Sequence, residues 1–310
     1  MTTEKKFLTS EDFTRIFKEP LSDFVLAKIT EANLSYQEIS STERDDCLIK
    51  IVNTLSDQFL VYSGAHRHEQ WDKGWAENLL DYSEKNDITA TKPKYFGKYP
   101  INRFEQRFIK ALSADFEVNI LGILQYWLFD KYLKNYNYIY EFGCGTGHNL
   151  LRLRELNSRA ELYGLDWAES SQQLIENLRA TGIDRNIYAH NFDFFKPDYN
   201  FQLKTNSAIF TMAALEQVGD RYKEFVDYLL ENKPALCLHI EPIAELLDPE
   251  HNLLDCLSVA YFNKRKYLSG YLDYLRSLED AGKIKILTAE RSYIGSFFID
   301  GYSVIAWQVI

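Results

Sequence analysis

Residues 138–151 read YIYEFGCGTGHNLL and contain three glycines at alternate positions, Gly143, Gly145 and Gly147. An aromatic, β-rich run precedes the glycines, and a run with helical spacing follows them. Glycines in such a turn let the backbone approach a ligand closely and adopt dihedral angles closed to other residues. The stretch therefore predicts a strand, a ligand-binding turn and a helix.

The chain after this point alternates between strand and helix patterns. We expect strands at 138–142, 161–166, 186–190, 206–211, 234–240, 284–289 and 302–309, and helices near 147–157, 168–181, 219–231, 251–260 and 265–281. This order predicts right-handed βαβ units around a mostly parallel sheet with helices on both faces. No helix pattern lies between the last two strands, so we expect the final strand to be antiparallel. Residues 134–310 should thus form an α/β, Rossmann-like, doubly wound domain with a seven-stranded sheet.

Residues 1–133 have a different pattern, in which apolar residues recur mainly at helical spacing. We expect an N-terminal helical domain here that covers the substrate as a lid. Residues 92–104, KPKYFGKYPINRF, interrupt the helices and predict an ordered loop. Its side chains Tyr95, Phe96, Tyr99 and Arg103 could fold over a ligand and exclude water; the alternative is a linker packed with aromatic residues.

The composition disfavours some classes of partner. A net charge of −10 and a pI near 5.2 disfavour nucleic acid as the main partner, because phosphate binding needs a basic face. No apolar run is long enough to span a bilayer, so we expect a cytoplasmic protein with no membrane partner. Aromatic residues make up 15% of the chain, as suits a cavity for an organic small molecule.

No metal site is expected. The four cysteines are too scattered for a metal cluster or a disulfide framework, at Cys47, Cys144, Cys237 and Cys256. His66 and His68 lie two positions apart, which does not place them on one helix face, and no second acidic or histidine cluster accompanies them.

The glycine spacing distinguishes between ligands. A dinucleotide turn has the pattern G-x-G-x-x-G, with the pyrophosphate on the helix N-terminus. Here the pattern is G-x-G-x-G, and His148 occupies the place of the third glycine. Glu141, just before the turn, would repel a pyrophosphate but would suit a ligand with an ammonium group. A nicotinamide oxidoreductase is therefore disfavoured.

Acidic and aromatic residues follow the next two strands. Asp166 lies about 20 residues after the turn, where a carboxylate can accept hydrogen bonds from ribose hydroxyls. Trp167 beside it can lie against an adenine ring. Asp193 can accept from an adenine amino group, with Phe192 supplying apolar contact. These positions predict a nucleoside ligand.

Together these residues resemble the class I S-adenosylmethionine-dependent methyltransferases, and EFGCGTG, residues 141–147, looks like the first motif of that family. The resemblance covers residues 138–310. It implies S-adenosylmethionine as the cofactor, with its methionine part against the glycine turn and its amino end near Glu141. By the same resemblance, the cofactor-binding residues are Glu141, Gly143, Cys144, Gly145, Gly147, Asp166, Trp167, Phe192 and Asp193, with Tyr95 from the lid loop.

Catalytic residues should come from the tips of the fourth and fifth strands. Glu216 lies just past the fourth. His239 and Glu241 lie on the fifth, one alternation apart and hence on the same face, so the acid could raise the basicity of the imidazole. The alternative is a core histidine, with Glu241 paired to an arginine such as Arg265 or Arg291.

The sequence therefore predicts a methyltransferase with a small or medium organic acceptor, methylated at oxygen rather than nitrogen, in a biosynthetic pathway. Two alternatives stay open: a protein or peptide N-methyltransferase, and a catalytically silent cofactor-binding subunit. The sequence indicates neither the acceptor nor the oligomeric state.

Overall fold

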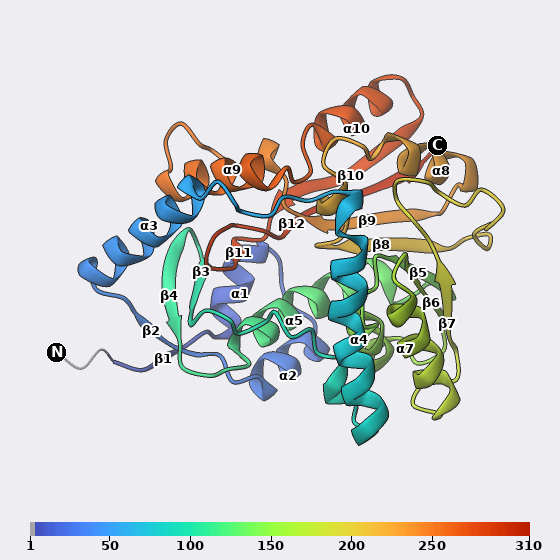
Figure 1. The fold of residues 1–310 in the computed structure, drawn as a ribbon, viewed down its shortest axis with the longest axis horizontal. Coiled ribbons are helices and arrows are strands. Elements are labelled where there is room, and N and C mark those ends of the chain that lie inside the picture. Colours follow the sequence, from blue (N-terminus) through green and yellow to red (C-terminus); the bar gives the residue numbers. More distant parts are fainter. Residues whose placement is uncertain (1–3) are drawn as a thin grey trace.

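The computed structural model describes residues 4–310, which form two sheets and the helices around them (Figure 1). The larger sheet has seven strands in the order β10-β12-β9-β8-β5-β6-β7. Its strands are β5 (Tyr138–Phe142), β6 (Glu161–Asp166), β7 (Ile187–Asn191), β8 (Ala208–Met212), β9 (Leu236–Glu241), β10 (Ile284–Arg291) and β12 (Ser303–Val309). β5 to β9 are parallel, whereas β12 is antiparallel to both β9 and β10. The predicted α/β sheet and its antiparallel final strand are thus confirmed.

Helices cover both faces of this sheet, because its strand residues alternate between two apolar clusters. On one face, Ile139 and Phe210 pack with α5, α6 and α7; on the other, Tyr140 and Ile209 pack with α8 and α10. The helices are α5 (Phe116–Leu128), α6 (His148–Leu156), α7 (Glu169–Ala180), α8 (Lys223–Asn232), α9 (Leu253–Arg265) and α10 (Tyr271–Asp280). Packing on both faces holds the strands in place, and with them the carboxyl edge of the sheet.

The N-terminal region contains the expected helices and also a second sheet. The remaining helices are α1 (Ser10–Phe17), α2 (Asp23–Glu31), α3 (Ser41–Ser56) and α4 (His68–Lys85). The second sheet has the order β1-β2-β4-β3-β11, with β1 (Lys6–Phe7), β2 (Ser35–Glu38), β3 (Ile101–Phe104), β4 (Arg107–Ala111) and β11 (Ile294–Gly295). The description of residues 1–133 as helical therefore missed four short strands, and the fifth comes from the other end of the chain.

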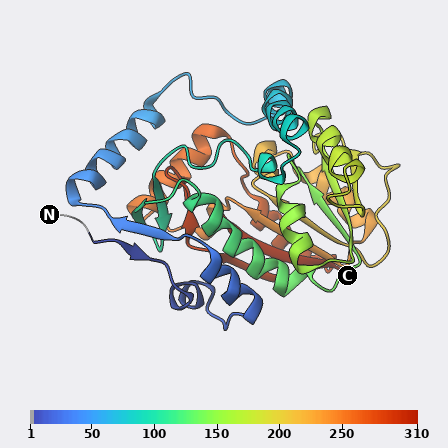
Figure 2. The ribbon, with the colours of Figure 1, turned by 90° about the horizontal axis from the view of Figure 1, so that it is seen from below.

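Two N-terminal helices are central to the site. α5 is almost entirely buried and continues as a π-helix over Phe129–Leu133. α4 lies alongside α7 (Figure 2), and the hydroxyl groups of Tyr82 and Thr181 are 2.7 Å apart between them. No helix within residues 4–310 has the length and apolar character needed to cross a membrane.

Candidate functional site

The glycine turn joins β5 to α6 in a conformation that only glycine adopts readily. Gly145 and Gly147 have φ angles of +50° and +73°. A Cβ on Gly147 would lie 2.3 Å from Ile175 Cδ1 on α7, so side chains are excluded here by packing as well. The turn thereby brings the start of α6 close to α7 and leaves backbone exposed to the space above it.

Asp166, at the end of β6, is tied to this turn. Its Oδ2 accepts a hydrogen bond from Gly145 N at 2.9 Å, and its Oδ1 accepts from Ala168 N, also at 2.9 Å. Burial raises the pKa of Asp166 to about 6, although these two backbone donors oppose the shift. The carboxyl group therefore connects the tips of the first two strands of the α/β domain.

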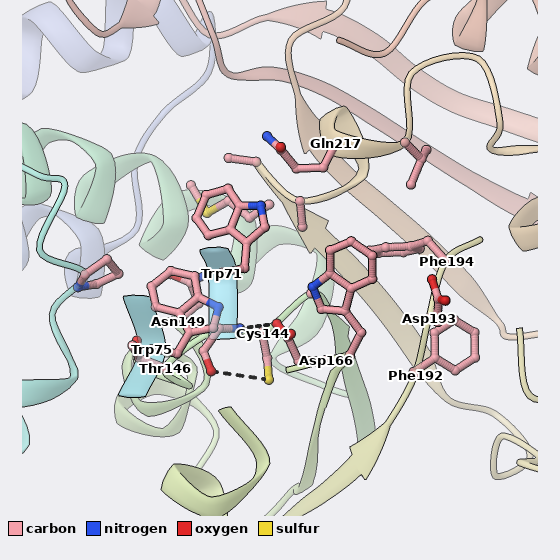
Figure 3. A pocket seen from close by; sticks show the side chains of 18 of the residues that line it. Trp71, Trp75, Cys144, Thr146, Asn149, Asp166, Phe192, Asp193, Phe194 and Gln217 are labelled. Atoms are coloured by element: carbon pink, nitrogen blue, oxygen red, sulfur yellow. Dashed lines mark hydrogen bonds between the residues drawn. The ribbon is translucent and has the colours of Figure 1, made fainter. Parts of the chain in front are cut away.

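A cavity, here called the first cavity, opens above the turn (Figure 3). Trp71 and Trp75 lie on one side of it and Phe192 and Asp193 on the other, with Asp166 between them. Eight of the ten predicted cofactor-binding residues line it: Tyr95, Gly143, Cys144, Gly145, Asp166, Trp167, Phe192 and Asp193. The structure thus brings together in one cavity residues that are about 100 positions apart in the chain.

The other two predicted residues lie behind the cavity wall. Gly147 precedes the first residue of α6. Glu141 is completely buried; its Oε1 accepts a hydrogen bond from Asn149 Nδ2 at 2.6 Å, and Oε2 has no partner within the described chain. Burial raises the pKa of Glu141 well above its ordinary value. Because Asn149 itself lines the cavity, Glu141 orients a residue of the wall.

The roof of the first cavity was missed by the sequence analysis. Trp71 and Trp75 lie one turn apart on α4, with their rings stacked at 5.5 Å, and the Trp75 ring covers Gly145. His68, one turn earlier, contacts the carbonyl oxygen of Trp167 through Nε2 at 3.0 Å. The spacing of the two tryptophans in HEQWDKGW was the available signal, since it places both on one helix face.

The lid loop divides between two cavities. Tyr95 lines the first cavity and also a second one, which Phe96 and Tyr99 line as well. Arg103 does not cover a ligand. It is buried and donates hydrogen bonds to the carbonyl oxygens of Phe297 and Phe298 and to Ser258 Oγ at 2.6 Å. Arg103 therefore joins β3 to α9 and to the segment before β12.

The second cavity is the larger one. Its volume is about 550 Å³, against about 90 Å³ for the first. The two share a wall made by Trp71, Trp75, Tyr95, Asn149, Met212, Ala213 and Gln217. Its other walls come from the N-terminal region, the end of α9 and the segment before β12. A molecule in the second cavity would therefore lie directly beside the contents of the first.

Of the three predicted catalytic residues, Glu216 lines the second cavity and the other two line neither. Burial raises the pKa of Glu216 to about 8, and the charge of Glu241 adds to the effect. Glu241 accepts hydrogen bonds from the backbone N–H groups of Ala214, Leu215 and Glu216 at 3.0–3.2 Å. Glu241 thus shapes the loop that carries Glu216.

His239 lies inside the α/β core. Its side chain is fully buried, its Nδ1 is 3.0 Å from Thr211 Oγ1, and its ring is 5.4 Å from that of Tyr271. Burial lowers the pKa of His239 to about 3. The alternative pairing of Glu241 with Arg291 is also absent, because Arg291 forms ion pairs with Asp255 and Asp300. The arrangement favours a structural role for His239.

His148 and the possible metal ligands can be placed as well. His148 begins α6 and lines the first cavity, and burial lowers its pKa to about 3, so it is neutral at physiological pH. Across residues 4–310, no group of three or more His, Cys, Asp or Glu side chains could hold a metal ion.

Comparisons with known proteins give partial likenesses. The chain matches no protein-family model. It is 34% identical over 62 residues to the protein-lysine N-methyltransferase EFM4 of Saccharomyces cerevisiae; this match covers 20% of the chain and spans about a quarter, 27%, of that protein's length.

Solved structures of similar fold include a geranyl diphosphate C-methyltransferase from Streptomyces coelicolor A3(2), with 13% identity, a TM-score of 0.46 and coverage of 76% of this chain and 98% of that one. LaPhzM has 14% identity, a TM-score of 0.46 and coverage of 97% and 93%. Both identities are below 25%, so these structures bear on the fold alone. The strand order, with the glycine turn after β5 and Asp166 at the end of the neighbouring β6, is that of a Rossmann-like α/β fold with its ligand site at the carboxyl edge of the sheet.

Proposed function

We propose that this enzyme transfers a methyl group to an oxygen atom of a small or medium organic acceptor bound in the second cavity. The observation that carries the proposal is the shared wall between the two cavities, with Glu216 on the acceptor side. Because the two cavities adjoin along this wall, a donor in one and an acceptor in the other would lie side by side, shielded from bulk water.

The first cavity suits the cofactor, S-adenosylmethionine. Asp166 would accept hydrogen bonds from the ribose, Trp167 and Phe192 would contact the adenine, and Asp193 would accept from its amino group. Glu141 lies behind the wall and would act on the amino end of the cofactor through Asn149, which lines the cavity and donates to Glu141 Oε1. When bound, the cofactor supplies an activated methyl group with its own leaving group.

The chain's own part in the reaction is positioning and proton removal. We propose that Glu216 accepts the proton of the acceptor hydroxyl as methyl transfer proceeds. A carboxyl group with a pKa near 8 is a stronger base than an ordinary one and is partly ionised near neutral pH. Glu241 holds the backbone of Glu216 in place through three hydrogen bonds and acts as a positioning residue.

Aromatic side chains make up much of the second cavity, including Trp71, Trp75, Tyr95, Phe297 and Phe298. This lining favours a flat organic molecule over an extended lysine side chain. The partial likeness to a protein-lysine N-methyltransferase keeps a protein acceptor as the second candidate. A biosynthetic role and a cytoplasmic location stay predictions from the sequence.

The test is incubation of the purified protein with radiolabelled S-adenosylmethionine and a lysate of its source cells. We expect label in the small-molecule fraction. Label in protein bands would support the second candidate instead. Tight cofactor binding without transfer to either fraction would favour a silent cofactor-binding subunit.

A further inference from the structure

Two arginines, Arg67 and Arg265, line the second cavity without forming an ion pair within residues 4–310. Arg67 is only 8% exposed; its guanidinium donates to Gln70 Oε1 at 3.0 Å and to Gln217 Oε1 at 2.8 Å. Arg265 donates through Nη1 to Tyr261 Oη at 3.1 Å, and its Nε is buried without a hydrogen-bond partner. Throughout residues 4–310, neither guanidinium takes part in an ion pair. Unpaired buried cations are costly unless a ligand completes them.

Two other buried arginines, Arg291 and Arg103, have acceptors within the protein for their guanidinium groups. Arg291, also buried, is neutralised by Asp255 at 2.7 Å and by Asp300 at 2.7 Å. Arg103 directs its donors to backbone carbonyls and Ser258. Arg67 and Arg265 follow neither pattern: within residues 4–310 they form no ion pair, and their donors go to the side chains of Gln70, Gln217 and Tyr261.

The fold brings Arg67 and Arg265 together although they lie nearly 200 positions apart in the sequence. Ser63 N donates to the carbonyl oxygen of Arg265 at 2.7 Å, and Ser63 Oγ donates to that of Lys266, so the segment before α4 is fixed to the end of α9. Burial lowers the pKa of Arg67, and the positive charge of Arg265 lowers it further. The two cations thus repel each other, and an anion between them would relieve that repulsion.

Glu216 does not remove the imbalance. It lies in the same cavity, but burial raises its pKa to about 8, so it is mostly protonated at pH 7. Even when ionised, one carboxylate balances only one of the two guanidinium groups. The charged side chains that line the cavity are four cationic ones, Arg67, Lys94, Lys98 and Arg265, and three acidic ones, Glu77, Glu117 and Glu216. Positive charge is thus in excess here, inside a protein whose net charge is −10.

We propose that the methyl acceptor is an aromatic carboxylate whose anionic group lies between Arg67 and Arg265. This inference rests on the proposed function and specifies its substrate class. Arginine is suited to the role because its planar donors match a carboxylate. Trp71, Phe297 and Phe298 supply flat apolar walls for the ring of the acceptor.

Binding of matched probes tests the proposal. Benzoate, 4-hydroxybenzoate and 1-naphthoate are titrated against the enzyme saturated with S-adenosylhomocysteine, each beside its neutral carboxamide, with calorimetry as the readout. We expect at least one carboxylate to bind about 10-fold or more tightly than its amide, a difference typical of a charge-assisted hydrogen bond. If every amide binds as well as its acid, the inference is wrong.

Variants then locate the preference. Arg265→Gln and Arg67→Gln should each bring the acid and amide affinities within about 2-fold of each other, while Arg276→Gln, an exposed arginine paired with Asp273, should leave the preference unchanged. Binding of S-adenosylhomocysteine and the melting temperature are measured for each variant as controls for folding. A wild-type preference that both cavity variants retain would contradict the assignment to these arginines. Failure of the wild-type enzyme to bind S-adenosylhomocysteine would instead contradict the proposed function.

Discussion

Asp72 on α4 caps the first turn of α7 from outside: its Oδ1 accepts hydrogen bonds from Ser170 N at 2.9 Å and from Ser170 Oγ at 2.8 Å. The backbone N–H of Ser170 lowers the pKa of Asp72, as a carboxylate at a helix N-terminus should experience. Since α4 carries Trp71 and Trp75, this contact fixes the roof of the first cavity to the domain that carries its floor.

Removing this cap should weaken cofactor binding. We expect Asp72→Ala to raise the Kd for S-adenosylhomocysteine about 5- to 20-fold, because one partly exposed charge-assisted contact contributes about 1–2 kcal/mol. Calorimetry measures the effect. Glu69→Gln is the matched control, since Glu69 is exposed on the same helix and pairs only with Lys73. Equal Kd values for Asp72→Ala and wild type would show that α4 does not form the roof.

Asp166 should matter more for cofactor affinity than any other side chain of the first cavity. Asp166→Ala removes the expected ribose acceptor and frees Gly145 N and Ala168 N, so we expect the Kd to rise about 30-fold or more. Asp166→Asn keeps one acceptor oxygen and should lose less. The cofactor assignment fails if Asp166→Ala retains its shape by circular dichroism and binds S-adenosylmethionine like the wild type.

The base proposed at Glu216 predicts a particular pH profile. Only the ionised carboxylate can accept a proton, so kcat should rise with pH through about 8. Glu216→Gln should lower kcat about 100-fold or more and abolish that rise, with cofactor affinity unchanged. Steady-state rates from pH 6 to 9.5 provide the test. A pH rise that persists in Glu216→Gln would assign it to another group.

The ionised form of Glu216, which is proposed to serve catalysis, should lower the stability of the folded state. The pKa of Glu216 is raised to about 8 in the folded state from its ordinary 4.5, so the folded state holds a proton that the unfolded state has lost. Its contribution is therefore absent below pH 4.5 and becomes increasingly destabilising as the pH rises to about 8, by at most roughly 5 kcal/mol. Glu216→Gln should melt at a higher temperature than wild type at pH 8.5 and at an equal one near pH 4. Equal melting temperatures at pH 8.5 would mean that Glu216 is not buried in solution.

Two glycines separate backbone strain from packing. Gly147 and Gly182 have similar φ angles, +73° and +80°, but a Cβ on Gly147 meets Ile175 Cδ1 at 2.3 Å whereas one on Gly182 meets nothing within 4 Å. Gly182→Ala should cost about 1 kcal/mol of unfolding free energy. Gly147→Ala should cost about 1–3 kcal/mol more through overpacking. Urea denaturation compares them, and equal losses would rule out the close contact between the turn and α7.

The sequence predicted the α/β domain well because buried parallel strands have distinct patterns; the observed strand ends differ from the predicted ones by at most two residues. The N-terminal sheet was missed for a local reason. The β3–β4 hairpin turns through Glu105 and Gln106, whose φ angles of +49° and +59° normally call for glycine or asparagine. No residue pattern marks that turn.

Some site residues could be placed from the sequence, and others could not. Residues such as Asp166 follow directly from strand ends, so sequence could place them at the first cavity. His239 has the same alternation as Glu241, and only the packing of Thr211 and Tyr271 around it shows that it faces the core. The second cavity joins Arg67 to Arg265, nearly 200 positions later, and no local pattern encodes such a meeting.

β11 has a consequence for how the chain folds during synthesis. Ile294 and Gly295 form the edge strand beside β3, nearly 200 residues after it, so the N-terminal sheet cannot be completed until residues 294–295 have left the ribosome. Contacts this distant in sequence are made late and slow the search for the native state. The lining of the second cavity runs from Arg67 to Tyr302, so a nascent chain that ends before residue 296 lacks part of its wall.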